Sequence, residues 1–192
     1  MAEGILLFVE QRDGIMGRTT LEALVASQEM AAGLGDKKIS AVVLGKGVAA
    51  VASEIAQKKL DRVYTVEDDK LEHYSPDGYV AALHQVVEKL APKFVILSHT
   101  YQVRDFIPKL TARLGKTLIP DCVGLRIDGG DVVFTRQVFQ GKINTDVRAA
   151  PSPTVFATFQ AGSYRADKAE AGTQPAPVEA LAVDMSAVNI RT

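Results

Sequence analysis

The chain has 192 residues, with 22 Lys and Arg against 23 Asp and Glu, so its formal net charge is −1. This near balance, without a basic block or any tryptophan, argues against a protein that binds nucleic acid. The single cysteine, Cys122, excludes an intramolecular disulfide and a cysteine metal cluster, and the length is enough to bury roughly 70% of the unfolded surface.

The amino terminus predicts a first strand and not a targeting segment. Residues 1–14, MAEGILLFVEQRDG, have a short apolar run before Glu10 and no basic stretch ahead of it. That run is also too short to cross a bilayer. We therefore expect a soluble cytoplasmic protein without direct membrane insertion.

Short apolar runs alternate with helical periodicity through the first 120 residues. Such alternation predicts an α/β fold, with an open and mostly parallel sheet and helices on its faces. The predicted strands are residues 4–9 (GILLFV), 39–44 (ISAVVL), 60–66 (LDRVYTV) and 93–97 (KFVIL).

The helices between these strands carry recognisable end signals. Thr19 and Glu22 have the spacing of a capping box for the first helix. Ser75 followed by Pro76 predicts the start of the third helix. We expect the fourth helix to open near Arg104, because the first turn of a helix is where a proline, here Pro108, is tolerated.

After Pro120 the apolar period changes from helical to alternating, which predicts an antiparallel β meander added to the α/β unit. Thr154 to Phe159 (TVFATF) predicts one more strand. We therefore expect a single α/β domain over 1–192. Its parts are a βα core (1–120), a β meander (121–160), a linker or surface loop (161–178) and a terminal strand (179–192).

Chemistry-bearing residues gather directly after the apolar run Val95–Leu97. Open α/β sheets bind ligands at the carboxyl ends of their strands, and a helix amino terminus attracts anions. These residues therefore suggest an anion pocket or an interdomain contact. The plainer alternative is that Thr100 only caps the turn and that Arg104 and Asp105 form a solvated pair. The candidate site residues are Ser98, Thr100, Arg104 and Asp105, with His99 beside them.

Other motifs carry weaker signals. Gly45 to Ala50 fits G-x-G-x-x-A, with an acidic run at Glu67–Asp69 about twenty residues on, but it follows the second predicted strand, not the first. That acidic run is more typical of a solvated turn than of a metal site. We find no catalytic triad and no metal site, and we expect Cys122 to be a small buried side chain.

Several segments together resemble the amino-terminal domain of the electron-transfer flavoprotein alpha subunit. The similarity runs from about Gly4 to Thr192, and its most specific part lies between Ser98 and Asp121. The segments are ILLFVEQRDG, TTLEALVAS, VVLGKG, DRVYTVED, FVILSHTYQVRDFIPKLTARLGKTLIPD and FTRQVFQGKINTDV.

The resemblance implies an adenine-nucleotide-hydrolase-like fold in a bacterial heterodimer of alpha and beta subunits. That heterodimer passes electrons from acyl-CoA or other dehydrogenases to a quinone reductase or a related acceptor. In the family, FAD is held chiefly by the alpha subunit's carboxyl-terminal domain, which we expect to be absent here, and AMP by the beta subunit. We therefore expect a scaffold domain that binds no FAD by itself.

Two rival classes have weaker support in the sequence. A nucleotide-binding regulatory module of the universal-stress type requires a glycine-rich phosphate loop late in the chain, and none follows Gly141. A hydrolase or transferase requires a nucleophile with a positioned base, and the sequence shows no such pair. We also expect an apolar surface on the meander from Val123 to Phe159, near Phe139 and Phe156, together with the terminal strand. The beta subunit or the missing domain should cover this surface, and in the isolated chain it should mediate a homodimer.

Overall fold

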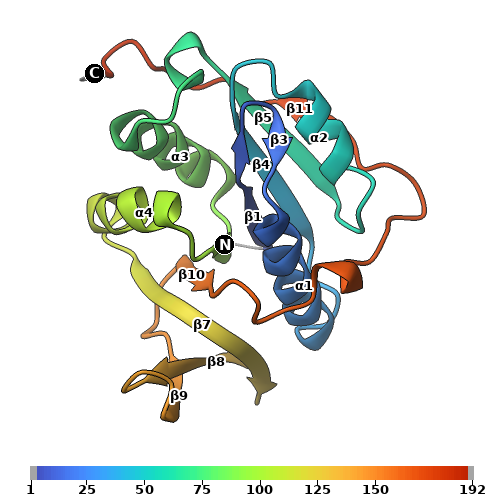
Figure 1. Ribbon diagram of the computed structural model, residues 1–192, viewed down its shortest axis with the longest axis vertical. Helices are drawn as coiled ribbons and strands as arrows, with labels where there is room; N and C mark the ends of the chain where they lie inside the picture. Colours follow the sequence, from blue (N-terminus) through green and yellow to red (C-terminus); the bar gives the residue numbers. More distant parts are fainter. Residues whose placement is uncertain (1–3, 190–192) are drawn as a thin grey trace.

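The computed structural model describes residues 4–189, and they build one large twisted sheet between helices (Figure 1). The strand order is β11-β5-β4-β1-β6-β10-β7-β8-β9. Neighbouring strands from β11 to β7 run parallel, whereas β7, β8 and β9 pair antiparallel. The predicted fold class, a mostly parallel open sheet with an added antiparallel meander, is confirmed.

The central strands are parallel and apolar over most of their length. They are β1 (Ile5–Val9), β4 (Ile39–Gly45), β5 (Arg62–Glu67), β6 (Phe94–Ser98) and β10 (Val155–Phe159). Every residue of β1, β6 and β10 is buried, because helices cover both faces of this part of the sheet.

Two helices cover each face (Figure 1). One apolar cluster packs beneath α1 and α2, and a second packs beneath α3 and α4. The bounds are α1 (Arg18–Gly33), α2 (Ala49–Ile55), α3 (Pro76–Leu90) and α4 (Tyr101–Leu114), with a short 3-10 turn, η1 (Asp69–Leu71), before α3.

The helix ends test the sequence signals individually. Ser75 caps α3 by accepting a hydrogen bond from the Gly78 amide, as predicted. The predicted capping box at Thr19 and Glu22 is wrong, because both residues lie inside α1. The N-cap residue is Gly17, so no side chain caps the helix. The helix α4 begins about one turn earlier than predicted, because Thr100 caps it, and Pro108 therefore lies inside the helix.

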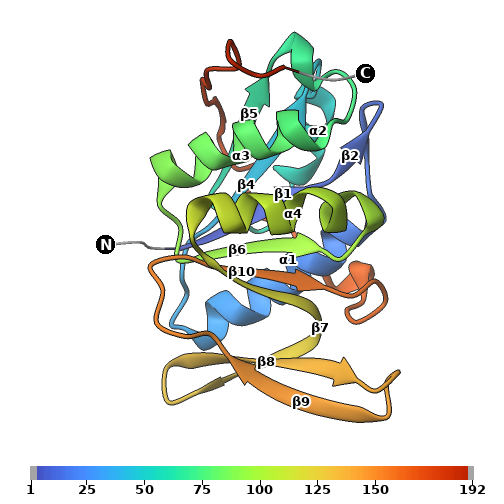
Figure 2. The ribbon, with the colours of Figure 1, turned by 90° about the vertical axis from the view of Figure 1, so that its left-hand side faces the viewer.

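The meander extends the sheet beyond the helices (Figure 2). It consists of the long strand β7 (Thr117–Asp128), β8 (Asp131–Val138) and β9 (Ile143–Arg148). The strand predicted over Thr154–Phe159 does not belong to it, since β10 inserts between β6 and β7 in the parallel part. Phe156 is consequently fully buried, and the predicted apolar surface near it is wrong at this residue, although Phe139 is 73% exposed.

The chain after β10 follows the surface back across the molecule. It passes α1 through the 3-10 turn η2 (Ala166–Lys168) and pairs with β5 as the short strand β11 (Val178–Ala180). The predicted terminal strand over 179–192 is wrong beyond β11, since residues 181–189 form no strand, and residues 190–192 lie outside the described residues.

A two-stranded hairpin, β2 (Gln11–Arg12) and β3 (Ile15–Met16), stands at the carboxyl edge directly after β1. Within residues 4–189, no helix combines the length and apolar character needed to cross a membrane.

Candidate functional site

The switch point of the sheet lies between the neighbouring strands β1 and β6, because α1 leads from β1 to β4 on one side and α4 leads from β6 to β7 on the other. Open α/β sheets bind ligands in the crevice at such a point. Here Glu10 follows β1 and Thr100 follows β6, and the Thr100 hydroxyl donates a hydrogen bond of 2.7 Å to Glu10 Oε2. The same hydroxyl accepts the Val103 amide as the cap of α4. Two side chains of the protein therefore bridge the crevice.

Glu10 is held firmly in this position. Its amide donates to Thr20 Oγ1 at 3.1 Å, and the Thr20 hydroxyl donates back to the Glu10 carbonyl at 3.3 Å. Burial raises the pKa of the Glu10 carboxyl, and the hydrogen bond from Thr100 opposes that shift. When ionised, this carboxylate repels any phosphate that enters the crevice.

A cavity of about 380 Å³ opens beside the switch point. Tyr74 and Tyr79 pack edge to face in its wall, with ring centroids 4.9 Å apart, and the Tyr74 hydroxyl donates to Asp105 Oδ2 at 2.6 Å. Burial raises the pKa of Tyr79 to about 12. The charged lining is acidic on balance, which disfavours a phosphate. The lining residues are Gln11, Arg12, Asp13, Glu72, His73, Tyr74, Tyr79 and Gln102.

The structure separates the four predicted site residues. Ser98 is buried, and its hydroxyl makes no hydrogen bond within residues 4–189. Thr100 caps α4, as the plainer alternative holds, but Arg104 and Asp105 contact different residues and not each other. Asp105 binds Tyr74, whereas the Arg104 guanidinium lies 5.6 Å from the centre of the Tyr101 ring.

A second polar cluster lies farther along the same edge, where β6, β7, β8 and β10 meet. His99 Nδ1 shares a hydrogen bond of 2.8 Å with Thr158 Oγ1, and His99 Nε2 lies 3.8 Å from Asp121 Oδ1. The Asp121 amide donates to the same threonine oxygen at 3.0 Å. Asp121 adopts a left-handed φ of 59° beside a bulge in β7, a conformation that aspartate tolerates better than most residues.

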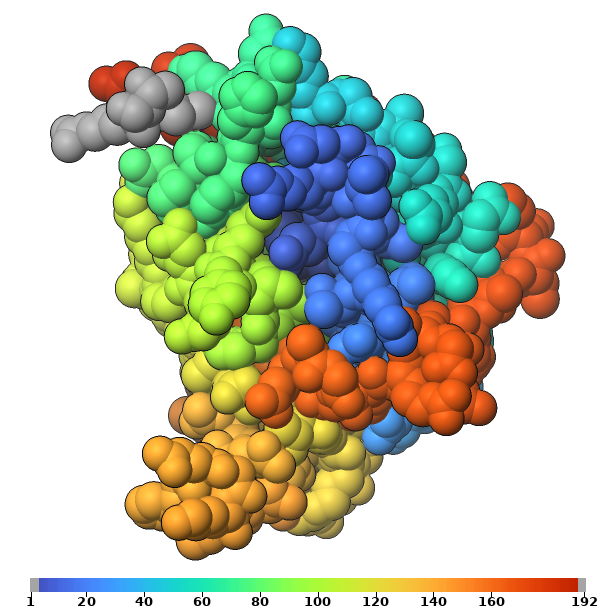
Figure 3. All heavy atoms as spheres, in the orientation of Figure 1, coloured from blue at the N-terminus to red at the C-terminus, as the bar shows by residue number. Residues whose placement is uncertain are grey.

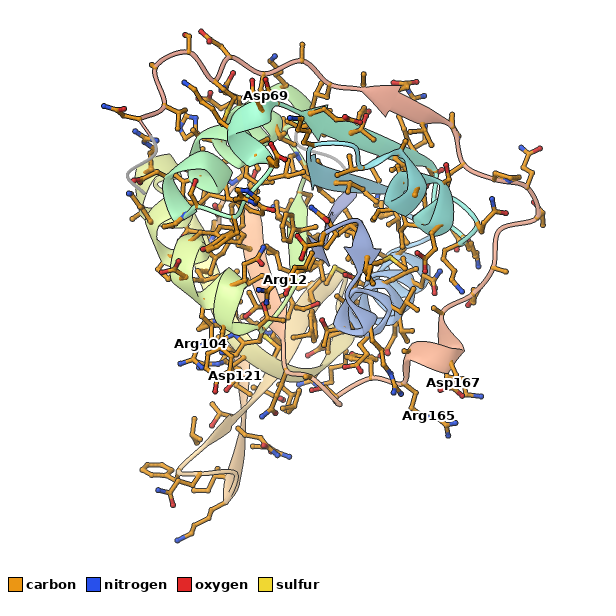
Figure 4. All side chains as sticks on the ribbon, turned by 45° about the horizontal axis from the view of Figure 1, so that its top comes forward. Arg12, Asp69, Arg104, Asp121, Arg165 and Asp167 are labelled. Atoms are coloured by element: carbon orange, nitrogen blue, oxygen red, sulfur yellow. The ribbon has the colours of Figure 1, made fainter. Side chains whose placement is uncertain are left out.

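Two arginines influence this cluster. Burial lowers the pKa of His99, and Arg104 and Arg136 lower it further, whereas Asp121 opposes them. Arg136 stands opposite Cys122 in the β7–β8 ladder, and its buried Nε makes no hydrogen bond to any described residue. Figure 4 shows Arg104 and Asp121 at the same corner of the molecule. Neither Asp121, which directly follows Pro120 where the period changes, nor Arg136, which lies in β8, was selected from the sequence.

The G-x-G-x-x-A loop has a local explanation. The Gly47 amide donates to Glu67 Oε2 at 3.0 Å, and Lys46 pairs with Asp69 and Glu72. The acidic side chains that a dinucleotide ribose would require thus bind the loop of their own chain. At Gly45, a Cβ would lie 2.5 Å from Val48 Cγ1, so packing alone demands glycine.

Comparison with known proteins gives a consistent result. The electron transfer flavoprotein domain model matches residues 5–186. The electron transfer flavoprotein subunit alpha of Bacillus subtilis (strain 168) is 33% identical over 192 residues, which are 100% of this chain and 57% of that protein. The protein of the same name from Syntrophomonas wolfei is 37% identical over 159 residues, covering 83% of this chain and 48% of that protein.

More distant relatives carry other names. The lactate dehydrogenase (NAD(+),ferredoxin) subunit LctC of Acetobacterium woodii is 26% identical over 158 residues, covering 82% of this chain and 38% of that protein. The chain thus spans about half the length of the curated relatives that it matches most fully.

Proposed function

The chain belongs to the electron transfer flavoprotein family, and from this membership we propose that it forms the amino-terminal scaffold of an alpha subunit. In this proposal it packs against a beta subunit. The complete heterodimer carries electrons from acyl-CoA or other dehydrogenases to a quinone reductase or a related acceptor in the cytoplasm. The scaffold holds its partner in place and performs no chemical step itself.

The observation that carries the scaffold role is the hydrogen bond between Thr100 and Glu10 across the switch point. A phosphate or pyrophosphate group bound there would meet the Glu10 carboxylate in place of free backbone donors, and Asp13 and Glu72 line the adjoining cavity. The residues at this position therefore do not fit FAD or AMP. The proposal assigns FAD to another part of the full-length protein and AMP to the beta subunit.

The meander supplies the surface that we assign to protein contacts. Phe139 is 73% exposed and Ile143 is 52% exposed, and both lie at the turn that joins β8 to β9. Figure 3 shows these strands as a projection from the main body. Phe139 also adopts a left-handed φ of 52°, which is strained for a bulky side chain, and such strain is concentrated at functional sites. Without a partner, we expect this surface to drive weak self-association.

Absorption spectroscopy tests the assignment of FAD. The purified 192-residue chain, mixed with excess FAD and passed through gel filtration, should emerge colourless. When the chain is mixed with the beta subunit in the same chromatography, the two proteins should elute together as a complex. Stoichiometric flavin bands on the chain alone would contradict the proposal.

Calorimetry tests the rival nucleotide-binding role. Titration of the chain with AMP or ATP should release no saturable heat at micromolar nucleotide. A variant with Glu10→Gln serves as a matched comparison, because it removes the charge and keeps an acceptor for Thr100. Micromolar binding by the wild-type chain would favour a nucleotide-binding module instead.

A further inference from the structure

Two arginines that have no ion-pair partner among residues 4–189 lie at one corner of the carboxyl edge. We call Arg104, Arg136, His99 and Tyr101 the basic corner. Within residues 4–189, neither arginine forms a salt bridge, whereas the exposed arginines Arg126 and Arg148 of the meander both bind aspartates. Arg104 lies in the first turn of α4, shortly after His99, and Arg136 faces Cys122 across the β7–β8 ladder. Asp121, the neighbour of Cys122, lies 3.8 Å from His99 Nε2, so the two arginines flank the same imidazole.

The corner combines an open side with an unsatisfied donor. Tyr101 is 89% exposed, and the Arg104 guanidinium lies over its ring. Arg136 lies deeper and is half-buried, and its enclosed Nε has no acceptor among the described residues 4–189. Because Nε is enclosed, an acceptor from outside the chain reaches Arg136 through the two terminal guanidinium nitrogens, which also have no hydrogen-bond partner among residues 4–189.

The charges of the corner define the complementary group. Arg104 and Arg136 contribute two positive charges, Asp121 contributes one negative charge, and burial favours the neutral form of His99. One carboxylate therefore neutralises the remaining positive charge. A doubly charged phosphate would leave the corner with a net negative charge, and Asp121 would repel it. Tyrosine and arginine are, in addition, the residue types that most often dominate the binding energy of protein interfaces.

We propose that the basic corner binds an acidic side chain of a partner protein, namely the beta subunit. The choice of this partner rests on the proposed function. The carboxylate accepts hydrogen bonds from Arg104 and Arg136, and the Tyr101 ring packs beside it. This assigns the predicted interdomain contact to Arg104 with Arg136, and not to the group of Ser98, Thr100 and Asp105.

Isothermal titration of the chain with the beta subunit of the same organism tests the proposal. Arg104→Gln and Arg136→Gln should each weaken binding about tenfold or more, and the losses should shrink as salt rises. The matched control is Arg113→Gln, which removes an arginine from the last turn of the same helix, outside the basic corner, and should leave the affinity unchanged. Because Arg104 lies on the surface of α4, its variant keeps the test valid even if Arg136→Gln unfolds.

The outcomes separate this inference from the proposed function. Wild-type affinity in Arg104→Gln, or an equal loss in Arg113→Gln, would overturn the inference and leave the proposed function intact. No binding by the wild-type chain would overturn both. NMR titration of the free chain with inorganic phosphate, followed at the His99 ring, should show no saturation below about 1 mM, an affinity of about 4.1 kcal/mol. Saturation below that concentration would identify a phosphate site and refute the carboxylate contact.

Discussion

The parallel part of the sheet and the antiparallel meander share one hydrogen-bonded ladder but bury their residues very differently. All five residues of β10 are buried, whereas in β9 only Val147 is partly covered. The difference follows from the helices, which cover both faces of the parallel strands and end before the outer meander (Figure 2). The comparison indicates that the parallel part supplies the stability of the fold and that the meander presents its surface to a partner.

The largest expected effect comes from one substitution made in both regions. Phe156→Ala removes a fully buried ring from β10 and should lower the free energy of unfolding by about 3–5 kcal/mol. Phe139→Ala removes an exposed ring from the meander and should change it by less than about 0.5 kcal/mol. Urea denaturation of both variants measures the difference. Equal losses would show that the meander also carries the core stability of the fold.

A smaller effect is expected where the meander touches α1. A Cβ at Gly33 would lie 2.4 Å from Ile127 Cγ1, so Gly33→Ala should cost about 1–3 kcal/mol through overpacking. In an Ile127→Ala background the clash disappears, and the same change should be neutral or stabilising because alanine favours a helix. Thermal denaturation of the four proteins of this cycle gives the coupling. Additive losses would mean that the contact is not what holds β7 against the helix.

Much of this architecture could be predicted from local pattern. The apolar runs of β1, β4, β5 and β6 and the Ser75–Pro76 start of α3 were visible in the sequence. The place of β10 was not, because its apolar run has the same pattern in a meander as in a parallel sheet. Which neighbours a strand pairs with depends on contacts between distant parts of the chain.

The candidate site was predictable as a region but not as a set of contacts. Thr100 and Asp105 are close in sequence to Arg104, yet α4 turns them toward different neighbours. Glu10 is 90 residues away from Thr100 in sequence and bonds to it across the switch point. The available signal was a carboxylate directly after the first buried strand. Arg136 reaches the corner only through the β7–β8 register.

The stability contributed by one carboxylate in each region should also change with pH in opposite directions. In the parallel part this carboxylate is Glu10. Burial raises the folded-state pKa of this carboxyl, so its contribution to stability is complete below the unfolded pKa and is lost as pH rises through the folded value. Glu10→Gln should therefore be at least as stable as the wild type at pH 7, and this advantage should disappear toward pH 4. Urea denaturation across that range measures it, with the exposed Glu54→Gln as control. A net loss at pH 7 would mean that the charged form is favoured.

The smallest effect is expected at Asp128 in the meander. The pKa of this carboxyl is lowered by its hydrogen bond with Arg126, and by the charge and hydrogen bond of Arg148 and the charge of Arg126. Its contribution is therefore present above the unfolded pKa and is lost as pH falls through the folded value, which is the reverse of Glu10. Asp128→Asn should lower the Tm slightly at pH 7 and low salt, because half-exposed ion pairs are well screened.

The difference between Asp128→Asn and the wild type should vanish in about 0.5 M salt, where the Debye length is only a few Å, and again in acid, where the wild-type carboxyl is protonated. Calorimetric scans at both salt concentrations and at two pH values measure the Tm. A large loss that persisted at high salt would place Asp128 among the groups that hold the meander together, and would remove the distinction between a stabilising parallel sheet and a surface-presenting meander.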